Sequence, residues 1–424
     1  MRCAGWLAIL TGSSSDTVRA TSCRLAGYRA DGVPIVDLDL NEAQLEFRDE
    51  VRAWLRRNVG TEPLAPSSTP EGFAAHRAWE RRLYEAGYAA ISWPRVYGGR
   101  DADLLNQTLF DEEYARAEAP ARINVLGLGL AGPTLMTCGT PAQCQRWLPS
   151  ILSCEQIWSQ GFSEPDAGSD LAALRTSARR EGDAFIVNGQ KVWTSLGRFA
   201  DWMFTLVRTD PQAPKHKGIS LLMIDLHRPG VSVAPIRQLN GDAGFAEVFL
   251  DDVAVPIDNL VGELNDGWRV AMTTLSFERG TGLGNHLRFS RDLQALVRLV
   301  RAAGAADDPL VRDRVAQLYI ETEVFRHHSY RALTRLVDGK PIGPEASLTK
   351  LYWSEMEARI FDAGMRVMGP YAELTSDAEQ AIDHQHWQAR YWYSRASCIY
   401  AGTSEIQKNI IAERVLGLPR QPRG

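Results

Sequence analysis

Residues 161–170 read GFSEPDAGSD, and at this stretch the chain changes from the patterning of helices to that of β-strands. Two glycines, a proline and small hydroxyl residues predict a tight loop whose backbone can come close to a ligand. Ser163 and Ser169 offer hydroxyl groups, and the N–H groups of such a loop can face phosphate or ring oxygens. The stretch therefore predicts a domain boundary and a ligand-binding loop at the same point.

The chain on the N-terminal side of this loop has the apolar spacing of α-helices. Asn41 can cap the first of these helices. The predicted helices cover residues 42–58, 73–87, 103–117 and 123–151. We therefore expect a helical N-terminal domain over residues 36–158.

Residues 1–35 differ from the rest of the chain. A short apolar patch lies behind Arg2, and a run of serines and three further arginines follow it. The pattern allows a weak signal or transit peptide, but no Ala-x-Ala cleavage site follows the patch. We predict a disordered extension here, with ordered structure from near Val36.

Short runs of β-type residues, separated by turn residues, occupy residues 159–267. The segment from Phe185 to Trp193, with Asn188-Gly189 at its centre, predicts a hairpin with a type I′ turn. Further strands are predicted over residues 202–207, 219–224, 231–234 and 246–250. Strands do not alternate with helices, so we expect an antiparallel sandwich or barrel and not a doubly wound parallel sheet.

From Trp268 the pattern is helical again, which predicts a third domain over residues 268–424. Helices are predicted over residues 311–337 and 345–368. Ser404 and Gln407 predict a capping box for a last helix that ends at Gly417. The chain is thus predicted to be an α+β multidomain protein with helical, β and helical domains in that order.

The composition argues against several classes of protein. The net charge of −5 gives no reason to expect a nucleic-acid partner, and no apolar run is long enough for a membrane span. Six cysteines form no Cys-x-x-Cys pair, which favours a reduced cytoplasmic chain over a disulfide framework or a zinc site. His384 and His386 have no third ligand at a recognisable spacing, so we predict no metal site.

Residues 127–132 read GLGLAG and match the Gly-x-Gly-x-x-Gly pattern of dinucleotide-binding loops. Such a loop needs a strand before it and a helix of several turns after it. Pro133 follows at once, and Gly139 ends any helix early. We therefore interpret these glycines as positions of close helix packing and predict no NAD site.

Two further motifs lie downstream, Ser276-Phe277-Glu278-Arg279 and the segment IYAGTSE at residues 399–405. Together with residues 161–170, and in this order, they resemble the acyl-CoA dehydrogenase family. The resemblance covers residues 36–420 and implies FAD as cofactor, an acyl-CoA thioester as substrate and a four-helix bundle in the C-terminal domain. It also implies an electron-transfer flavoprotein as redox partner, and assembly as a homodimer, a homotetramer or a related heterotetramer.

The resemblance assigns cofactor-binding residues position by position. Ser163 would bind the pyrimidine part of the flavin, Trp193 would lie against the ring, and Ser195 would place a hydroxyl near N5. The complete set of these positions is Gln160, Phe162, Ser163, Ser169, Trp193, Ser195, Gly369, Thr403 and Glu405. Taken without the neighbouring motifs, Trp193 would be interpreted as a core residue of the hairpin.

Oxidation of a saturated acyl-CoA requires a base for the proton on Cα, and a carboxylate screened from water suits this task because desolvation raises its pKa. Family members carry the base either in a Tyr-Glu-Gly-Thr motif or directly before an arginine on the first C-terminal helix. This chain has Ala401 in the first place and Glu278-Arg279 in the second. We therefore predict Glu278 as the catalytic base. The competing interpretation is an exposed helix pair.

Arg279, Ser169, Ala401 and Gly402 are the predicted substrate-binding residues, with the N–H of Ala401 polarising the thioester. Alanine at position 401 leaves volume beside the thioester, and the glycines at 280, 282 and 284 thin another wall. These features predict a branched or otherwise bulky acyl chain.

The chain departs from the family pattern where an Arg-x-x-Phe-Gly stretch usually reaches the FAD pyrophosphate of a neighbouring subunit. Arg288 or Arg301 is the candidate for that contact. Two other functions stay open from the sequence. The chain can be a catalytically silent subunit of a heteromeric dehydrogenase, or a flavin monooxygenase or oxidase on the same fold.

Overall fold

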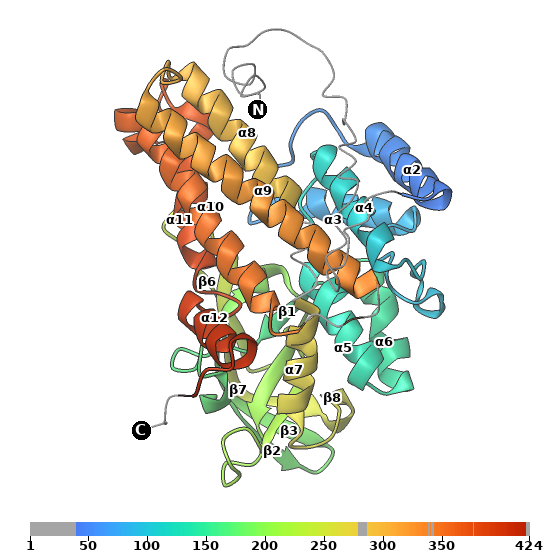
Figure 1. Ribbon diagram of the computed structural model, residues 1–424. Coiled ribbons are helices and arrows are strands. Elements are labelled where there is room, and N and C mark those ends of the chain that lie inside the picture. The colour runs from blue at the N-terminus through green and yellow to red at the C-terminus, as the bar shows by residue number, and fades with distance from the viewer. Residues whose placement is uncertain (1–39, 279–285, 338–339, 341–342, 376, 421–424) are drawn as a thin grey trace. The chain divides into compact units, whose positions relative to one another are not determined.

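The computed structural model describes residues 40–278, 286–337, 340, 343–375 and 377–420. The described residues form two compact units, one that covers residues 41–278 and one that covers the residues from 286 onward. Figure 1 shows the first unit as a group of helices beside a sheet, and the second unit as a set of long helices. The predicted extension at residues 1–35 lies outside the described residues. So does Arg279, which is one of the predicted substrate-binding residues.

The first unit begins with three helices whose starts follow from local capping. Helix α2 (Glu42–Asn58) begins after Asn41, which forms a capping box with Gln44 as its sequence predicts. Helix α3 (Pro70–Glu85) begins three residues before the predicted start because Thr69 caps it and Pro70 takes the first helical position. Helix α4 (Leu104–Arg116) is capped by Asp103.

Three helical elements share the region predicted to be helical over residues 123–151. A π-helical turn covers Gly127–Ala131, α5 covers Gly132–Cys138, and α6 covers Pro141–Leu152. Gly139 ends α5, and Thr140 then caps α6. A Cβ at position 132 would lie 2.2 Å from the indole of Trp93. The interpretation of this glycine as a position of close packing is therefore confirmed.

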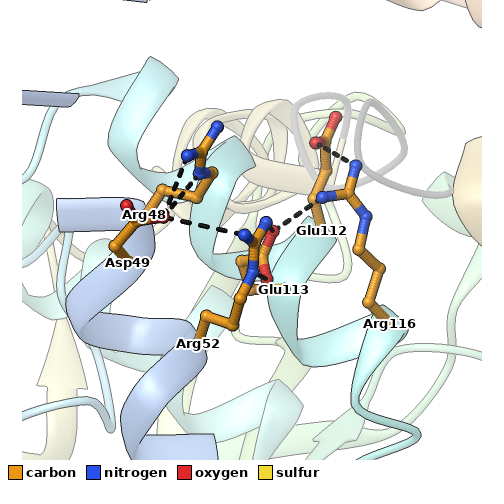
Figure 2. A network of polar contacts seen from close by, with 6 residues as sticks. All are labelled: Arg48, Asp49, Arg52, Glu112, Glu113 and Arg116. Carbon is orange, nitrogen blue, oxygen red and sulfur yellow. Dashed lines mark hydrogen bonds and ion pairs between the residues drawn. The ribbon is translucent and has the colours of Figure 1, made fainter. Parts of the chain in front are cut away.

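An alternating set of charges joins α2 to α4. Glu113 of α4 accepts two hydrogen bonds from Arg52 of α2, at 2.7 and 2.8 Å, and one from Arg116 at 2.7 Å. Figure 2 shows Arg48 and Asp49 extending the same chain of contacts along α2. Because the Glu113 side chain is only 3% exposed, its contacts stabilise the helix pair more than exposed ion pairs do.

Replacing Glu113 by glutamine is expected to lower the free energy of unfolding by about 2 kcal/mol, because hydrogen bonds to a charged group are lost at a buried position. The matched control is Asp49→Asn in the same network, whose side chain is 60% exposed and whose loss should cost under about 0.5 kcal/mol. Urea denaturation of both variants checks the difference. Equal losses would contradict the role given to burial.

The middle of the first unit is an eight-stranded sheet with the strand order β6-β7-β3-β2-β4-β5-β8, and with β1 beside β4. Its strands are β1 (Trp158–Gly161), β2 (Ser177–Glu181), β3 (Ala184–Ser195), β4 (Trp202–Arg208), β5 (Ile219–Asp225), β6 (Val231–Ile236), β7 (Phe245–Pro256) and β8 (Leu260–Val261). The described pairings are antiparallel except those that β4 makes with β1 and, at one position, with β2.

Strands β4 and β5 are buried on both faces, which explains why their sequences do not alternate between apolar and polar residues. Met203 and Val207 of β4 belong to one core cluster with apolar residues of β3 and β7. Phe204 and Leu206 face a second cluster, which includes apolar residues of α5 and α6. The sheet thus forms a sandwich with one side covered by helices.

The predicted hairpin at Asn188-Gly189 is wrong. These two residues form a bulge inside the continuous strand β3, where the pairing with β7 shifts between Val187 and Gly189. Gly189 has φ of +152°, and a Cβ there would lie 2.5 Å from the hydroxyl of Thr176. The real turn is Gly182-Asp183, between β2 and β3.

The second unit is a bundle of helices with one core. Its helices are α8 (His286–Ala302), α9 (Pro309–Val337), α10 (Ala346–Met368), α11 (His386–Ser397) and α12 (Ser404–Ile410). Phe289, Phe325, Phe361 and Trp387 meet in the core of α8 to α11, as the four-helix bundle of the family implies. None of the described helices has the length and apolar character that a membrane span requires.

The start of the last helix differs from its prediction by one residue. Thr403, and not Ser404, caps α12 by accepting a hydrogen bond from the N–H of Ile406 at 3.2 Å. Gln407 does not close a capping box, because its amide donates to the carbonyl of Ala401 at 3.0 Å. This glutamine therefore fixes the loop that precedes the helix.

Candidate functional site

The loop of residues 161–170 begins at the end of strand β1. Gly161 is itself in the strand, and a Cβ there would lie 2.6 Å from the sulfur of Met203. Packing on β4, and not approach to a ligand, therefore requires glycine at this position. Gly168, in contrast, has open space where a Cβ would point. Ser169 beside it is exposed, while the Ser163 side chain is partly buried.

A buried ion pair that the sequence analysis missed holds this loop on the sheet. The Lys191 side chain is fully buried, and its Nζ donates to Glu164 Oε1 at 2.8 Å and to the carbonyl of Phe162 at 3.3 Å. Glu164 also accepts from the N–H groups of Arg175 at 2.6 Å and Thr176 at 2.9 Å. The pair thus ties the loop to β3 and to the start of β2.

The pKa values of both partners are lowered in the folded chain, for different reasons. Burial lowers the pKa of Lys191 to about 8, although the carboxylate of Glu164 opposes this shift. Burial alone would raise the pKa of Glu164, but Lys191 and the neighbouring donors outweigh it, and the net shift is downward. The sequence around Lys191 did not indicate this ion pair. Lys191 is buried because the loop with Glu164 packs over it, and sequence alone does not show that contact.

The pKa of Lys191 predicts a pH dependence of stability. Between pH of about 8 and the ordinary lysine pKa of 10.5, the unfolded chain binds more protons at this residue than the folded chain. Raising the pH through this window therefore increases the free energy of unfolding. We expect the advantage of the wild-type chain over Lys191→Met to grow across the window, measured by urea denaturation on both sides of it. A constant difference would contradict the lowered pKa.

The sheet brings five of the predicted cofactor residues together, Gln160, Phe162, Ser163, Trp193 and Ser195. The carbonyl of Ser163 accepts a hydrogen bond from the N–H of Val192 at 3.0 Å. The carbonyl of Ser195 accepts one from the hydroxyl of Ser159 at 2.7 Å. The ring of Phe162 is buried against Phe204, with 5.7 Å between the ring centroids.

Trp193 is not the core residue that its sequence alone suggests. Its side chain is 57% exposed, and its φ of +60° is a conformation that bulky residues rarely adopt. The strand pairing shifts between Lys191 and Thr194, so a second bulge in β3 turns this indole outward. Such backbone strain, at a cost of about 1 to 3 kcal/mol, is typical of functional positions.

Two buried polar atoms of the sheet, one on β1 and one on β3, have no hydrogen-bond partner within the described ranges. They are the amide nitrogen Nε2 of Gln160 and the hydroxyl oxygen of Thr194. A buried donor without a partner costs about 1 to 3 kcal/mol. A polar group of a ligand would satisfy the amide of Gln160, which is one of the predicted cofactor-binding residues.

Helix α7 (Gly267–Glu278) ends at the predicted base and packs against β5 and α5 within the first unit. Thr274 is fully buried, and its hydroxyl lies 2.9 Å from that of Thr134 in α5. Position 278 follows Thr274 by four residues and Ala271 by seven, so it lies on the same helix face. The side chain of Glu278 lies outside the described part of the chain.

A groove lies at the other end of α7. Its lining includes His216, Lys217, Asn265, Trp268 and Arg269. The rings of His216 and Trp268 meet edge to face, with 4.8 Å between their centroids. The lining also includes Asp210 and Asp266, and Asp266 accepts a hydrogen bond from Arg269 at 2.6 Å. The groove thus combines aromatic, basic and acidic side chains. None of these residues forms a motif in the sequence, because the loop at 210–218 and the start of α7 are far apart along the chain.

The remaining predicted residues belong to the second unit. Ala401 is exposed with φ of +52°, and its N–H donates no hydrogen bond to a described residue. The side chain of Thr403 is used as the cap of α12. Glu405 is exposed on the first turn of that helix. Gly369 is exposed, with φ of +54° and open space where a Cβ would point.

A carboxylate buried inside the bundle supports the loop at Ala401. Glu357 of α10 is paired with Arg288 of α8 and accepts from Arg390 at 2.7 Å and from the hydroxyl of Ser397 at 2.6 Å. The Ser397 hydroxyl lies 3.3 Å from that of Tyr400. A line of polar contacts thus runs from three helices to the residue before Ala401.

Comparison with known proteins identifies the class to which this fold and these sites belong. Family models match the acyl-CoA dehydrogenase N-terminal domain over residues 41–155, the middle domain over 159–253 and the C-terminal domain over 265–416. The chain belongs to the acyl-CoA dehydrogenase family, and it is an oxidoreductase of that kind.

Among individual relatives, the chain is 42% identical over 386 residues to acyl-CoA dehydrogenase IpdE1 of Mycobacterium tuberculosis, covering 89% of this chain and 99% of that protein. A solved Tcur3481-Tcur3483 steroid ACAD is 30% identical, with a TM-score of 0.79 over 91% of this chain and all of that one. The ChsE4-ChsE5 complex from Mycobacterium tuberculosis is also 30% identical, with a TM-score of 0.78 over the same shares.

Members of this family are FAD-dependent, and the first unit offers a test of whether its residues fit a flavin. A flavin ring is flat, and its pyrimidine edge carries hydrogen-bonding atoms. The buried donor of Gln160 without a partner and the exposed indole of Trp193 meet both needs. The residues present therefore fit FAD.

Proposed function

We propose that this chain catalyses the FAD-dependent α,β-dehydrogenation of an acyl-CoA with a branched or bulky acyl chain. The observation that carries the proposal is the place of Glu278. It is the last residue of α7, four positions after the buried Thr274 and seven after the buried Ala271. The end of α7 and the residues proposed to hold the flavin thus belong to the same unit.

Glu278 would take the proton from Cα, and the N–H of Ala401 would stabilise the charge that develops on the thioester oxygen. Gln160, Ser163, Trp193 and Ser195 would hold the flavin. Bound FAD supplies the acceptor for the hydride from Cβ, so that a double bond forms between Cα and Cβ.

The groove at the start of α7 would bind the nucleotide end of CoA. His216 and Trp268 offer aromatic rings for the adenine, and Lys217 offers positive charge for the phosphates. Arg269 is paired with Asp266 of the same groove. Eleven residue steps separate Gly267 from Glu278, which corresponds to about 17 Å of helix. The extended pantetheine arm of CoA would follow this length to the thioester.

Two features support a bulky acyl chain. Alanine stands where a glutamate side chain would otherwise fill space beside the thioester. The chain is also similar to a solved steroid ACAD over nearly its whole length. The glycines at 280, 282 and 284 also contribute to the expectation of a bulky acyl chain, and they lie outside the described residues.

After each turnover, an electron-transfer flavoprotein would reoxidise the reduced FAD.

The test uses the purified full chain, loaded with FAD and kept without oxygen. Straight-chain, branched and ring-bearing acyl-CoAs are added in turn, and the flavin absorbance is followed. We expect bleaching, fastest with a ring-bearing or branched substrate. A protein that retains no FAD, or that is bleached only by short straight chains, would contradict the proposal. Rapid reaction of the reduced flavin with oxygen would instead support an oxidase or monooxygenase.

A second candidate function is that of a catalytically silent subunit in a heteromeric acyl-CoA dehydrogenase. Position 401 lacks a carboxylate, and the similar ChsE4-ChsE5 structure is a complex of two chains. Size-exclusion chromatography of the chain expressed alone tests this candidate. A yellow homo-oligomer that is bleached by an acyl-CoA would reject it.

A further inference from the structure

The pair formed by Lys191 and Glu164 has no part in the chemistry proposed above, although Lys191 contacts the carbonyl of Phe162, one of the predicted cofactor-binding residues. Both side chains are almost completely removed from solvent, with exposures of 0% and 8%. Taking two charges out of water is costly, and an apolar pair of similar volume is often equally stable. Stability alone is therefore a weak explanation for a lysine and a glutamate at these positions.

The contacts of the pair indicate what it determines. Lys191 Nζ donates to the carbonyl of Phe162, and the next residue, Ser163, accepts from the N–H of Val192. The loop is thus held at two successive peptide groups by two successive residues of β3. Trp193, with its left-handed backbone, follows directly. The contacts of the pair therefore determine how far residues 162 and 163 of the loop lie from the indole of Trp193.

We infer that Lys191 and Glu164 are positioning residues for FAD, which hold residues 162 and 163 at the correct distance from Trp193. The inference rests on the proposed function, since it concerns the same flavin site. Glu164 contributes by tying this point to a third segment, through the N–H groups of Arg175 and Thr176. Neither side chain touches the flavin in this account. They act through the backbone that does.

The test separates FAD affinity from stability. Lys191→Met leaves a buried carboxylate without its partner and is expected to lower both. The double variant Lys191→Met/Glu164→Gln removes both charges and keeps an oxygen for the N–H groups of Arg175 and Thr176. We expect it to regain the thermal midpoint of the wild-type chain but to bind FAD about tenfold more weakly, as when supporting residues behind other binding sites are lost.

FAD affinity is measured by fluorescence titration of the apoprotein, and stability by thermal unfolding without FAD. Arg179→Met is the matched control, because it removes an exposed cation paired with Glu181 on the neighbouring strand β2. It should leave FAD affinity unchanged. Wild-type FAD affinity in the double variant would overturn the inference while leaving the proposed function in place. A wild-type chain that binds no FAD would instead overturn the proposed function, and the inference with it.

Discussion

Glu278→Gln is expected to slow the bleaching of the flavin by an acyl-CoA by at least about a hundredfold, because a positioned general base contributes about this much or more to proton transfer. Glutamine keeps the size of the side chain and its hydrogen-bonding capacity but cannot accept a proton from Cα at ordinary pH. Substrate binding should change little, since the affinity for CoA would come mainly from the nucleotide groove. Stopped-flow absorbance under anaerobic conditions, with the substrate that the panel identifies, measures the rate.

Glu263→Gln is the matched control, because this glutamate is exposed and lies shortly before α7. Its rate of bleaching should equal that of the wild-type chain. Equal rates for the wild-type chain and Glu278→Gln would move the base elsewhere. The flavin content of each variant is measured first, so that loss of cofactor is not mistaken for loss of the base.

Glu357→Gln is expected to lower the free energy of unfolding of the chain by about 3 kcal/mol, because it leaves two arginines in a partly buried site without their central carboxylate. Among the carboxylates of the described residues, Asp292 would then be the one left near Arg288 and Arg390, at 3.9 and 3.7 Å. The hydroxyl of Ser397 would also lose its charged acceptor. Urea denaturation, followed by circular dichroism of the helices, measures the effect.

Glu355 offers a control two residues away on the same helix. Its side chain is 38% exposed, compared with 1% for Glu357, and its contacts with Arg359 and Lys408 are 4.0 and 3.8 Å long. Glu355→Gln should change the free energy of unfolding by less than about 0.5 kcal/mol. If both variants lost the same stability, the network would not be organised around Glu357.

Local signals predicted much of the helical structure. Asn41 fixes the start of α2 through contacts within four residues, and such contacts can be read from sequence. The same reasoning was off by one residue at α12, where Gln407 had a partner outside the expected capping box. Strands β1, β2 and β8 were not predicted, because they are short, and β2 buries only one of its residues.

The error at Asn188-Gly189 has a specific physical cause. The dipeptide favours a two-residue turn when strand pairing is local. Here β3 pairs along its length with β7, which begins about fifty residues later, and the glycine is needed where Thr176 approaches the strand. A long-range pairing thus outweighed a local turn preference.

By itself, the sequence determined the order of the domains, the family and the residue types of the candidate site, because these depend on periodicity, caps and short motifs along the chain. Only the tertiary structure decided that Lys191 is enclosed with Glu164, that Trp193 is turned outward, and that His216 meets Trp268. Each of these features depends on segments that are far apart in the chain and come together only on folding. The burial of a side chain and its pairing with a charge are set by those long-range contacts.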